Sequence, residues 1–247
     1  MAPLNQTELV PHPQRGRRFT HERKVRLGDV TTSGRLRLDA LARYLQDVAS
    51  DDVGDAGITG AWVMRRLALE IVRLPRFGDD VGLTTFCSGT GSRLAERRTT
   101  LAVDGEAAVE AVAVWVYLNS DTGRPAPLEP WFLDLYGEAA GGRRVSGRLR
   151  LARPPLDAPA RPWPLRVTDF DVLGHVNNAV HWEAVEDELA RGTPGRRIVA
   201  AELEHRSPVE PGETLELRSG GDDGLLAVWL VGRAGDVRTA ARVGLAG

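Results

Sequence analysis

The sequence predicts an α+β protein made of two similar units, each with one helix packed against a mostly antiparallel sheet. A segment with helical spacing of apolar residues begins near residue 38, and another begins near residue 179. Each follows a short β-type run and a Gly/Asp turn, and each is followed by strand-like runs separated by Gly, Pro and Asp. The same order of elements occurs twice, which indicates an internal repeat.

The helical segments are defined by apolar residues three or four apart, which lie on one face of a helix. These residues are Leu38, Leu41, Leu45 and Val48 in the first unit, and Val180, Ala184, Val185 and Leu189 in the second. The expected strands are residues 62–73, 80–88, 93–103 and 107–118, then 197–206, 214–218, 225–233 and 236–245.

Composition divides the chain into a first unit at residues 20–128, a Pro/Gly/Arg-rich linker at 129–164 and a second unit at 165–246. Two units joined edge to edge would form one longer sheet and cover an exposed strand edge. Two independent α+β domains are the alternative. The fused arrangement is favoured because a unit of about 110 residues has a small core of its own.

The overall composition is that of a globular protein, with 247 residues, 42% hydrophobic, 27% charged and a net charge of −2. No apolar run approaches the length of a membrane span, and the N-terminal segment lacks the apolar core of a signal peptide. We therefore expect a cytoplasmic protein that binds no nucleic acid. The single cysteine, Cys87, excludes an internal disulfide, and no phosphate-loop, dinucleotide or metal-ligand motif predicts a cofactor or a metal.

The stretch TDFDVLGHVNNAVHW (168–182) carries the most chemistry, and a reduced copy of it lies near residue 29. Aligning the two copies places Asp29, Thr31, Gly34 and Arg35 opposite Asp169, Asp171, Gly174 and His175. Only the second copy therefore has both an acid and an imidazole.

An acid, an imidazole and two amides at the mouth of a helix can bind and attack a carbonyl group. Asp171 is the candidate carboxylate, and His175 and Asn177 are the other candidate catalytic residues. Gly174, Val176 and Asn178 belong to the stretch whose backbone N–H groups could stabilise an oxyanion at the helix N-terminus. The alternatives are a turn aspartate, a structural histidine and amides that brace or cap the loop.

Further motifs along the chain point to a family. These are AWVMRRLALEIVRLPRFGDDV (61–81), FCSGTGSRLAERRTTL (86–101), VWVYLNSDTGRPAPL (114–128) and DFDVLGHVNNAVHW (169–182). In this order they resemble the acyl-ACP thioesterases of plants and bacteria, which are double hotdogs: two tandem units in which an antiparallel sheet wraps around a long helix.

The chain departs from the usual pattern of that family at three places. Leu173 stands where the family has an Asn, Pro208 and Val209 are aligned with a Glu-Cys pair on the following strand, and His181 replaces a Tyr. The local sequence DFDVLGHVNN (169–178) also resembles single-domain acyl-CoA thioesterases of the 4-hydroxybenzoyl-CoA type, which centre on one Asp at the position of Asp171.

The resemblance implies hydrolysis of fatty acyl thioesters in fatty acid biosynthesis, with acyl carrier protein bearing an acyl-phosphopantetheine as the partner. An acyl-CoA thioesterase is the nearest alternative, and the protein would be a monomer or a homodimer. The non-catalytic first unit would supply the acyl pocket, with Leu45 and Trp62 in its wall and Arg66 steering the carrier. Tyr44, Gln46 and Asp47 are weaker candidates for the wall.

Two functions of other kinds stay open on sequence grounds. An enoyl-thioester hydratase is disfavoured because such enzymes place Asp and His five residues apart around a proline-containing turn. A non-catalytic acyl-thioester binding protein would account for the changes at Leu173, Pro208 and Val209.

Overall fold

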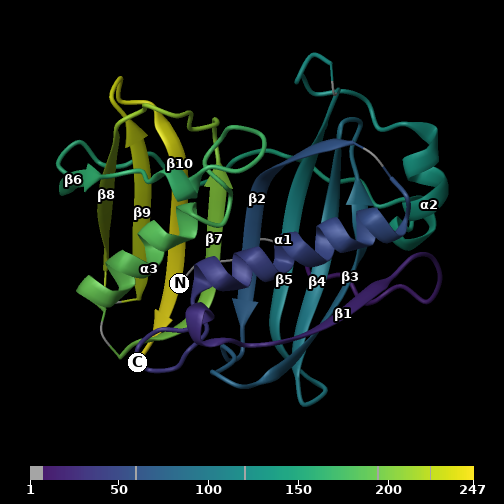
Figure 1. Ribbon diagram of the computed structural model, residues 1–247, viewed down its shortest axis with the longest axis horizontal. Helices are drawn as coiled ribbons and strands as arrows, with labels where there is room; N and C mark the ends of the chain where they lie inside the picture. The colour runs from purple at the N-terminus through teal and green to yellow at the C-terminus, as the bar shows by residue number, and fades with distance from the viewer. Residues whose placement is uncertain (1–7, 59, 120, 194, 223) are drawn as a thin grey trace.

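The computed structural model describes residues 8–58, 60–119, 121–193, 195–222 and 224–247. Within these residues, ten strands form one sheet in the order β1-β3-β4-β5-β2-β7-β10-β9-β8-β6, and every pair of neighbours is antiparallel. Figure 1 shows α1 lying across the first half of this sheet and α3 across the second half. This is the double hotdog that the sequence predicts.

The elements of the first half are β1 (Phe19–Lys24), α1 (Leu38–Asp55), β2 (Ala61–Ile71), β3 (Asp80–Thr90), β4 (Leu94–Val103), β5 (Glu106–Leu118) and α2 (Pro130–Ala140). Those of the second half are β6 (Ala160–Trp163), α3 (His181–Gly192), β7 (Arg197–His205), β8 (Leu215–Asp222), β9 (Leu225–Gly232) and β10 (Val237–Ala246). A short 3₁₀ helix precedes each long helix, η1 (Leu27–Asp29) and η2 (Val167–Asp169).

The two half-sheets meet where β2 pairs with β7. Read outward from this junction, the strand order is β2-β5-β4-β3-β1 on one side and β7-β10-β9-β8-β6 on the other. Each half therefore repeats the other about an approximate two-fold axis. At the junction Leu67 pairs with Leu203, both fully buried in the core beneath the helices, so the two units share one core as expected for the fused arrangement.

Residues 129–164, expected to be a linker, contain the helix α2 and the edge strand β6. The helix begins at Pro130, a favourable first helical residue, and ends at Gly141, which has the left-handed conformation that glycine adopts readily. Its buried face, including Phe132 and Tyr136, packs over the outer end of the first half-sheet. The segment between the halves therefore carries two ordered elements that the sequence did not predict.

The remainder of this segment crosses the face of the sheet opposite α1 and α3, and hydrogen bonds attach it to both half-sheets. The Thr90 N–H donates to the Arg143 carbonyl at 3.0 Å, and the Leu151 N–H donates to Glu204 Oε1 at 3.1 Å. The Trp229 indole N–H donates to the Ala152 carbonyl at 2.9 Å. The Leu151 bond helps to satisfy the buried Glu204 carboxylate, and the three bonds together attach this segment to the sheet.

Within the described part of the chain, no helix combines the length and the apolar character needed to cross a membrane. The sequence-based expectation for the N-terminal segment includes residues 1–7, which lie outside the described residues.

The junction of the half-sheets predicts the effect of Leu203→Ala. The change leaves a cavity beneath both helices, so we expect the free energy of unfolding to fall by about 2–5 kcal/mol. Because the two units share one core, urea unfolding should remain a single transition. Leu156→Ala, at a fully exposed position, is the matched control and should change little. Two separate transitions in the wild-type protein would contradict the shared core.

Candidate active site

The two loops that precede the long helices have the same backbone hydrogen bonds. Thr31 N–H donates to the Arg35 carbonyl at 2.8 Å, as Asp171 N–H does to that of His175 at 3.0 Å. The following turn is closed by Gly34 in one loop and by Gly174 in the other, with φ of 78° and 77°. The internal alignment is thus confirmed in three dimensions, and Thr31 and Asp171 occupy equivalent positions.

The carboxylate of Asp171 is held in place by its own loop. Its Oδ1 accepts the Leu173 N–H at 2.9 Å, and its Oδ2 accepts a long hydrogen bond of 3.4 Å from Asn177 Nδ2. Asn177 Oδ1 in turn accepts the Ala179 N–H at 3.0 Å, at the start of the turn that leads into α3. Asn177 therefore connects the acid to the helix N-terminus and fixes the direction of both.

Asp171 borders a pocket of about 400 Å³, a size typical of small-molecule sites. The pocket lies between the C-terminal part of α1, the first half-sheet, α2 and the loop that carries Asp171. Its wall is formed by Gln46, Ala49, Ser50, Val53, Gly60, Ala61, Trp62, Cys87, Ala95, Glu96, Arg97, Trp115, Phe132, Asp171, Val172, Leu173, Asn177 and Asn178. One half thus provides the acid and the other provides most of the cavity.

A buried polar cluster lies in the wall of the pocket at Arg97. Arg97 Nη2 is 2.7 Å from Asp52 Oδ2, and Asp52 also accepts hydrogen bonds from Arg17 Nε at 2.6 Å and Tyr136 Oη at 2.9 Å. Asp52 is only 1% exposed, and three donors surround its carboxylate. The cluster ties α1 to β4 and α2, so this part of the pocket wall is rigid and polar.

Cys87 lies in the pocket wall but is not poised as a nucleophile. Burial raises the pKa of its thiol to about 11, so the thiol is protonated at neutral pH. Its Sγ donates a weak hydrogen bond to the Gly89 carbonyl at 3.5 Å.

The structure brings four of the predicted site residues to the pocket: Asp171, Asn177, Asn178 and Trp62. His175 lies on the same loop, half-buried and outside the pocket wall, and its imidazole has no hydrogen-bond partner among the described residues. Gly174 is at the exposed turn, and Val176 is buried with its N–H bonded to the Val209 carbonyl at 2.9 Å.

Two predicted residues from the first half lie away from the pocket. Leu45 lies on the buried face of α1, within the hydrophobic core, and is not part of the pocket wall. Arg66 is on the opposite face of the sheet, paired in register with Glu204 and 4.0 Å from Glu202. It is 5% exposed and cannot steer a carrier from that position.

Pro208 and Val209, aligned with the family's Glu-Cys pair, follow the end of β7. Val209 is buried, and its carbonyl accepts the Val176 N–H of the Asp171 loop. No sequence signal pointed to Arg97, which reaches the pocket only because β4 and α1 pack together.

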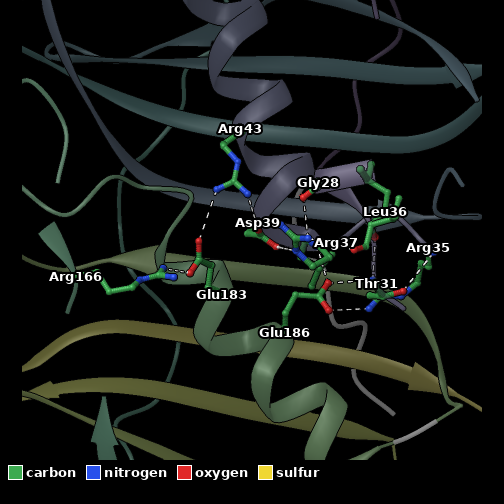
Figure 2. Close-up of polar contacts among 12 residues, drawn as sticks. Gly28, Thr31, Arg35, Leu36, Arg37, Asp39, Arg43, Arg166, Glu183 and Glu186 are labelled. Atoms are coloured by element: carbon green, nitrogen blue, oxygen red, sulfur yellow. Dashed lines mark hydrogen bonds and ion pairs between the residues drawn. The ribbon is translucent and has the colours of Figure 1, made fainter. Parts of the chain in front are cut away.

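The equivalent loop of the first half is closed by ion pairs (Figure 2). Glu186 of α3 accepts hydrogen bonds from Arg35 Nη1 at 3.0 Å and Nη2 at 2.7 Å. Its Oε1 also accepts the Leu38 N–H, the first of α1, at 2.6 Å. Nearby, Arg43 of α1 lies 3.8 Å from Glu183 of α3. This loop has no acid at Thr31, and a charged pair covers its helix N-terminus.

Two buried histidines lie behind the Asp171 loop. His181, which replaces the family's Tyr, is 4% exposed and has Nδ1 2.6 Å from Thr239 Oγ1. Its ring meets that of His205 edge-on at 4.9 Å. Burial lowers the pKa of His181 to about 4, and burial together with the neighbouring His181 and Arg65 lowers the pKa of His205 well below its usual value.

Comparison with known protein families gives matches across both halves of the chain. Residues 16–136 match the N-terminal domain of acyl-ACP thioesterases, and residues 156–236 match their C-terminal domain. An uncharacterized protein of Mycobacterium tuberculosis is 29% identical over 236 residues, covering 94% of each chain. Oleoyl-acyl carrier protein thioesterase 2 of Arabidopsis thaliana is 27% identical over 205 residues, which cover 69% of this chain and 55% of the plant protein.

Solved structures support the fold. An acyl-ACP thioesterase from Bacteroides thetaiotaomicron superposes with a TM-score of 0.79 at 20% identity, covering 93% of this chain and 98% of the other. The 12:0-ACP thioesterase of Umbellularia californica gives a TM-score of 0.79 at 18% identity, with 93% and 97% covered.

The histidine pair predicts a stability that falls in mild acid. Both imidazoles are neutral in the folded protein, whereas an unfolded chain binds a proton at a pKa near 6.5. The stabilisation is therefore complete above pH 6.5 and is lost as the pH falls toward the lowered pKa values. For His181, with a pKa of about 4, it amounts to roughly 3 kcal/mol.

Urea unfolding of His205→Leu, measured between pH 4.5 and 7.5, tests whether the buried histidine pair makes the stability fall in mild acid. His205 Nε2 has no partner among the described residues, so the variant should match the wild type near pH 7.5 and lose less stability below pH 6.5. His21→Gln, at a half-exposed histidine, is the control and should retain the wild-type slope. An unchanged slope in His205→Leu would contradict the neutral buried pair.

Proposed function

The chain belongs to the acyl-ACP thioesterase family, and from this premise we propose that it hydrolyses fatty acyl thioesters of acyl carrier protein at the Asp171 pocket. The observation that supports the proposal is the Asp171 carboxylate, restrained by its loop, at the edge of a cavity of about 400 Å³ beside a helix N-terminus. A thioester hydrolase needs such a group next to space for the acyl chain.

The reaction requires an ionised Asp171. In one route the carboxylate takes a proton from water as the water oxygen attacks the carbonyl carbon; in the other the carboxylate itself attacks and water cleaves the resulting anhydride. In both routes the C–S bond breaks when the tetrahedral intermediate collapses. The leaving thiolate takes up a proton, and the products are a free fatty acid and the carrier thiol.

The other loop residues have positioning roles in this proposal. Asn177 holds the Asp171 carboxylate by its side chain and caps the turn into α3, so the acid and the helix N-terminus keep a fixed relation. The Asn178 N–H at this N-terminus, where the helix dipole is positive, stabilises negative charge on the carbonyl oxygen. His175 is proposed to assist from the same loop, outside the pocket wall.

The carrier would approach at the tip of the loop. Val172 and Leu173 line the pocket and are 102% and 55% exposed, so apolar side chains surround the entrance. Such a rim suits an acyl chain bound to a long thiol arm, which must enter from solvent and bury its apolar part. Phosphopantetheine is the arm of both acyl carrier protein and coenzyme A, and family membership favours the former.

Release of free thiol from C8 to C18 acyl-ACP and acyl-CoA, wild type beside Asp171→Asn, tests the function. Loss of the carboxylate should lower kcat by about 10²–10⁴-fold with little change in stability. Asp157→Asn, at an exposed linker aspartate, is the matched control and should keep wild-type rates. His175→Gln, measured beside them, should lower kcat by a smaller factor if the imidazole assists.

The outcomes separate the alternatives. Faster turnover of acyl-CoA than of acyl-ACP would make the protein an acyl-CoA thioesterase. Ligand binding without release of thiol would identify a non-catalytic binder, and equal rates for wild type and Asp171→Asn would exclude Asp171 as the working acid.

A further inference from the structure

The two-fold relation between the halves assigns a counterpart to each residue around the loops. Thr31 and Asp171 are counterparts, and other counterparts are the same number of positions apart in the sequence. By this spacing, Gln46 of α1 corresponds to Glu186 of α3. The same spacing pairs Leu38 with Asn178. These pairs allow the closed loop of the first half to be used as a guide to the open pocket of the second.

In the closed loop, Glu186 reaches across from the opposite helix and supplies an oxygen to a helix N-terminus. Its Oε1 accepts the Leu38 N–H at 2.6 Å. Arg35 pairs with the same carboxylate and neutralises its charge (Figure 2). The bond to Leu38 shows that the Leu38 N–H points toward α3 and that an oxygen atom fits between this N–H and the opposite helix.

In the open pocket the corresponding groups are present but not joined. Gln46 lies in the same wall as Asp171 and Asn178, as the two-fold relation requires. Its side chain forms no hydrogen bond with any described residue, and its Oε1 is buried. The Asn178 N–H likewise has no acceptor among the residues that the structure describes. Among the described residues, no oxygen therefore accepts the Asn178 N–H in the way that Glu186 Oε1 accepts the Leu38 N–H.

We propose that Gln46 is a substrate-positioning residue, whose side-chain amide binds the carbonyl oxygen of the thioester together with the Asn178 N–H. The carbonyl oxygen would take the place that Glu186 Oε1 occupies in the closed loop. This inference rests on the proposed function and extends it to a residue contributed by the non-catalytic half. Two donors, one from each half, would then face the oxygen on which negative charge develops.

The change from Glu to Gln between the halves has a physical reason. A carboxylate at position 46 would itself accept the Asn178 N–H and would place a second negative charge beside Asp171 and the developing oxyanion. The first half tolerates a carboxylate because Arg35 pairs with it, whereas the counterpart of Arg35 is His175. A neutral amide adds no negative charge at this place and can donate through its own nitrogen.

Two substitutions at Gln46 test the role. Gln46→Met keeps the length of the side chain but cannot donate, so kcat on acyl-ACP should fall by roughly 100-fold, while KM rises by no more than about tenfold. Gln46→Glu should lower kcat at least as much. Its carboxylate should also move the acid limb of the pH–rate profile to higher pH, because it favours protonated Asp171. Gln14→Met, at an exposed glutamine, is the control.

Two readouts do not depend on turnover. In Gln46→Glu the Asn178 amide should exchange its hydrogen more slowly than in the wild type, as expected if the new carboxylate caps it like Glu186. A ketone analogue of the thioester, with CH₂ in place of sulfur, should bind Gln46→Met about tenfold more weakly than wild type.

The results distinguish failure of the inference from failure of the function. Thiol release that is unchanged in Gln46→Met would overturn the role of Gln46 and leave the thioesterase standing. Absence of thiol release in the wild type, with weaker ketone binding in Gln46→Met, would overturn the thioesterase and retain the carbonyl contact. A wild-type protein that neither releases thiol nor binds the ketone would overturn both.

Discussion

The antiparallel pairing of β2 with β7 is the constraint on which the rest of the structure depends. It joins two half-sheets into one, buries Leu67 against Leu203 and sets the approximate two-fold axis. That axis places the helix of each half against the loop of the other, so α1 faces the Asp171 loop and α3 faces the Thr31 loop. An active site at either place therefore needs both halves, and neither unit alone could form the pocket.

The two equivalent loops differ in the contacts of the helix N-terminus that follows each of them. At the Thr31 loop a charged pair, Arg35 and Glu186, satisfies the helix N-terminus and joins the halves. At the Asp171 loop the corresponding residues are His175 and Gln46, and the helix N-terminus stays open to the pocket. One half uses its helix N-terminus for a bond between the halves, whereas the other half has a carboxylate and an N–H without a protein acceptor beside the pocket.

The sequence predicted the repeat, both long helices and eight of the ten strands closely, because these segments have strong periodicity and clear turn residues. It did not predict β1 or β6, which are short, half-exposed edge strands, or α2, whose proline and glycine were attributed to a linker. The placement of Arg66 failed for a local reason. The register of β2 shifts between Met64 and Arg66, so the extra residue turns Arg66 to the face opposite the pocket. The pocket wall combines residues from several elements, and a local sequence pattern does not predict which distant elements pack together.

The open helix N-terminus links folding to catalysis. The first N–H groups of a helix have no partner within the helix, so a folded protein must satisfy them by side chains, solvent or ligand. Glu186 does this for Leu38 with a permanent bond, and a permanent bond would compete with any substrate oxygen. Where the corresponding N–H of Asn178 is left without a protein acceptor, the carbonyl oxygen that accepts it gains most as it becomes negatively charged. The interaction is then strongest in the transition state, and this is the condition under which binding energy accelerates a reaction.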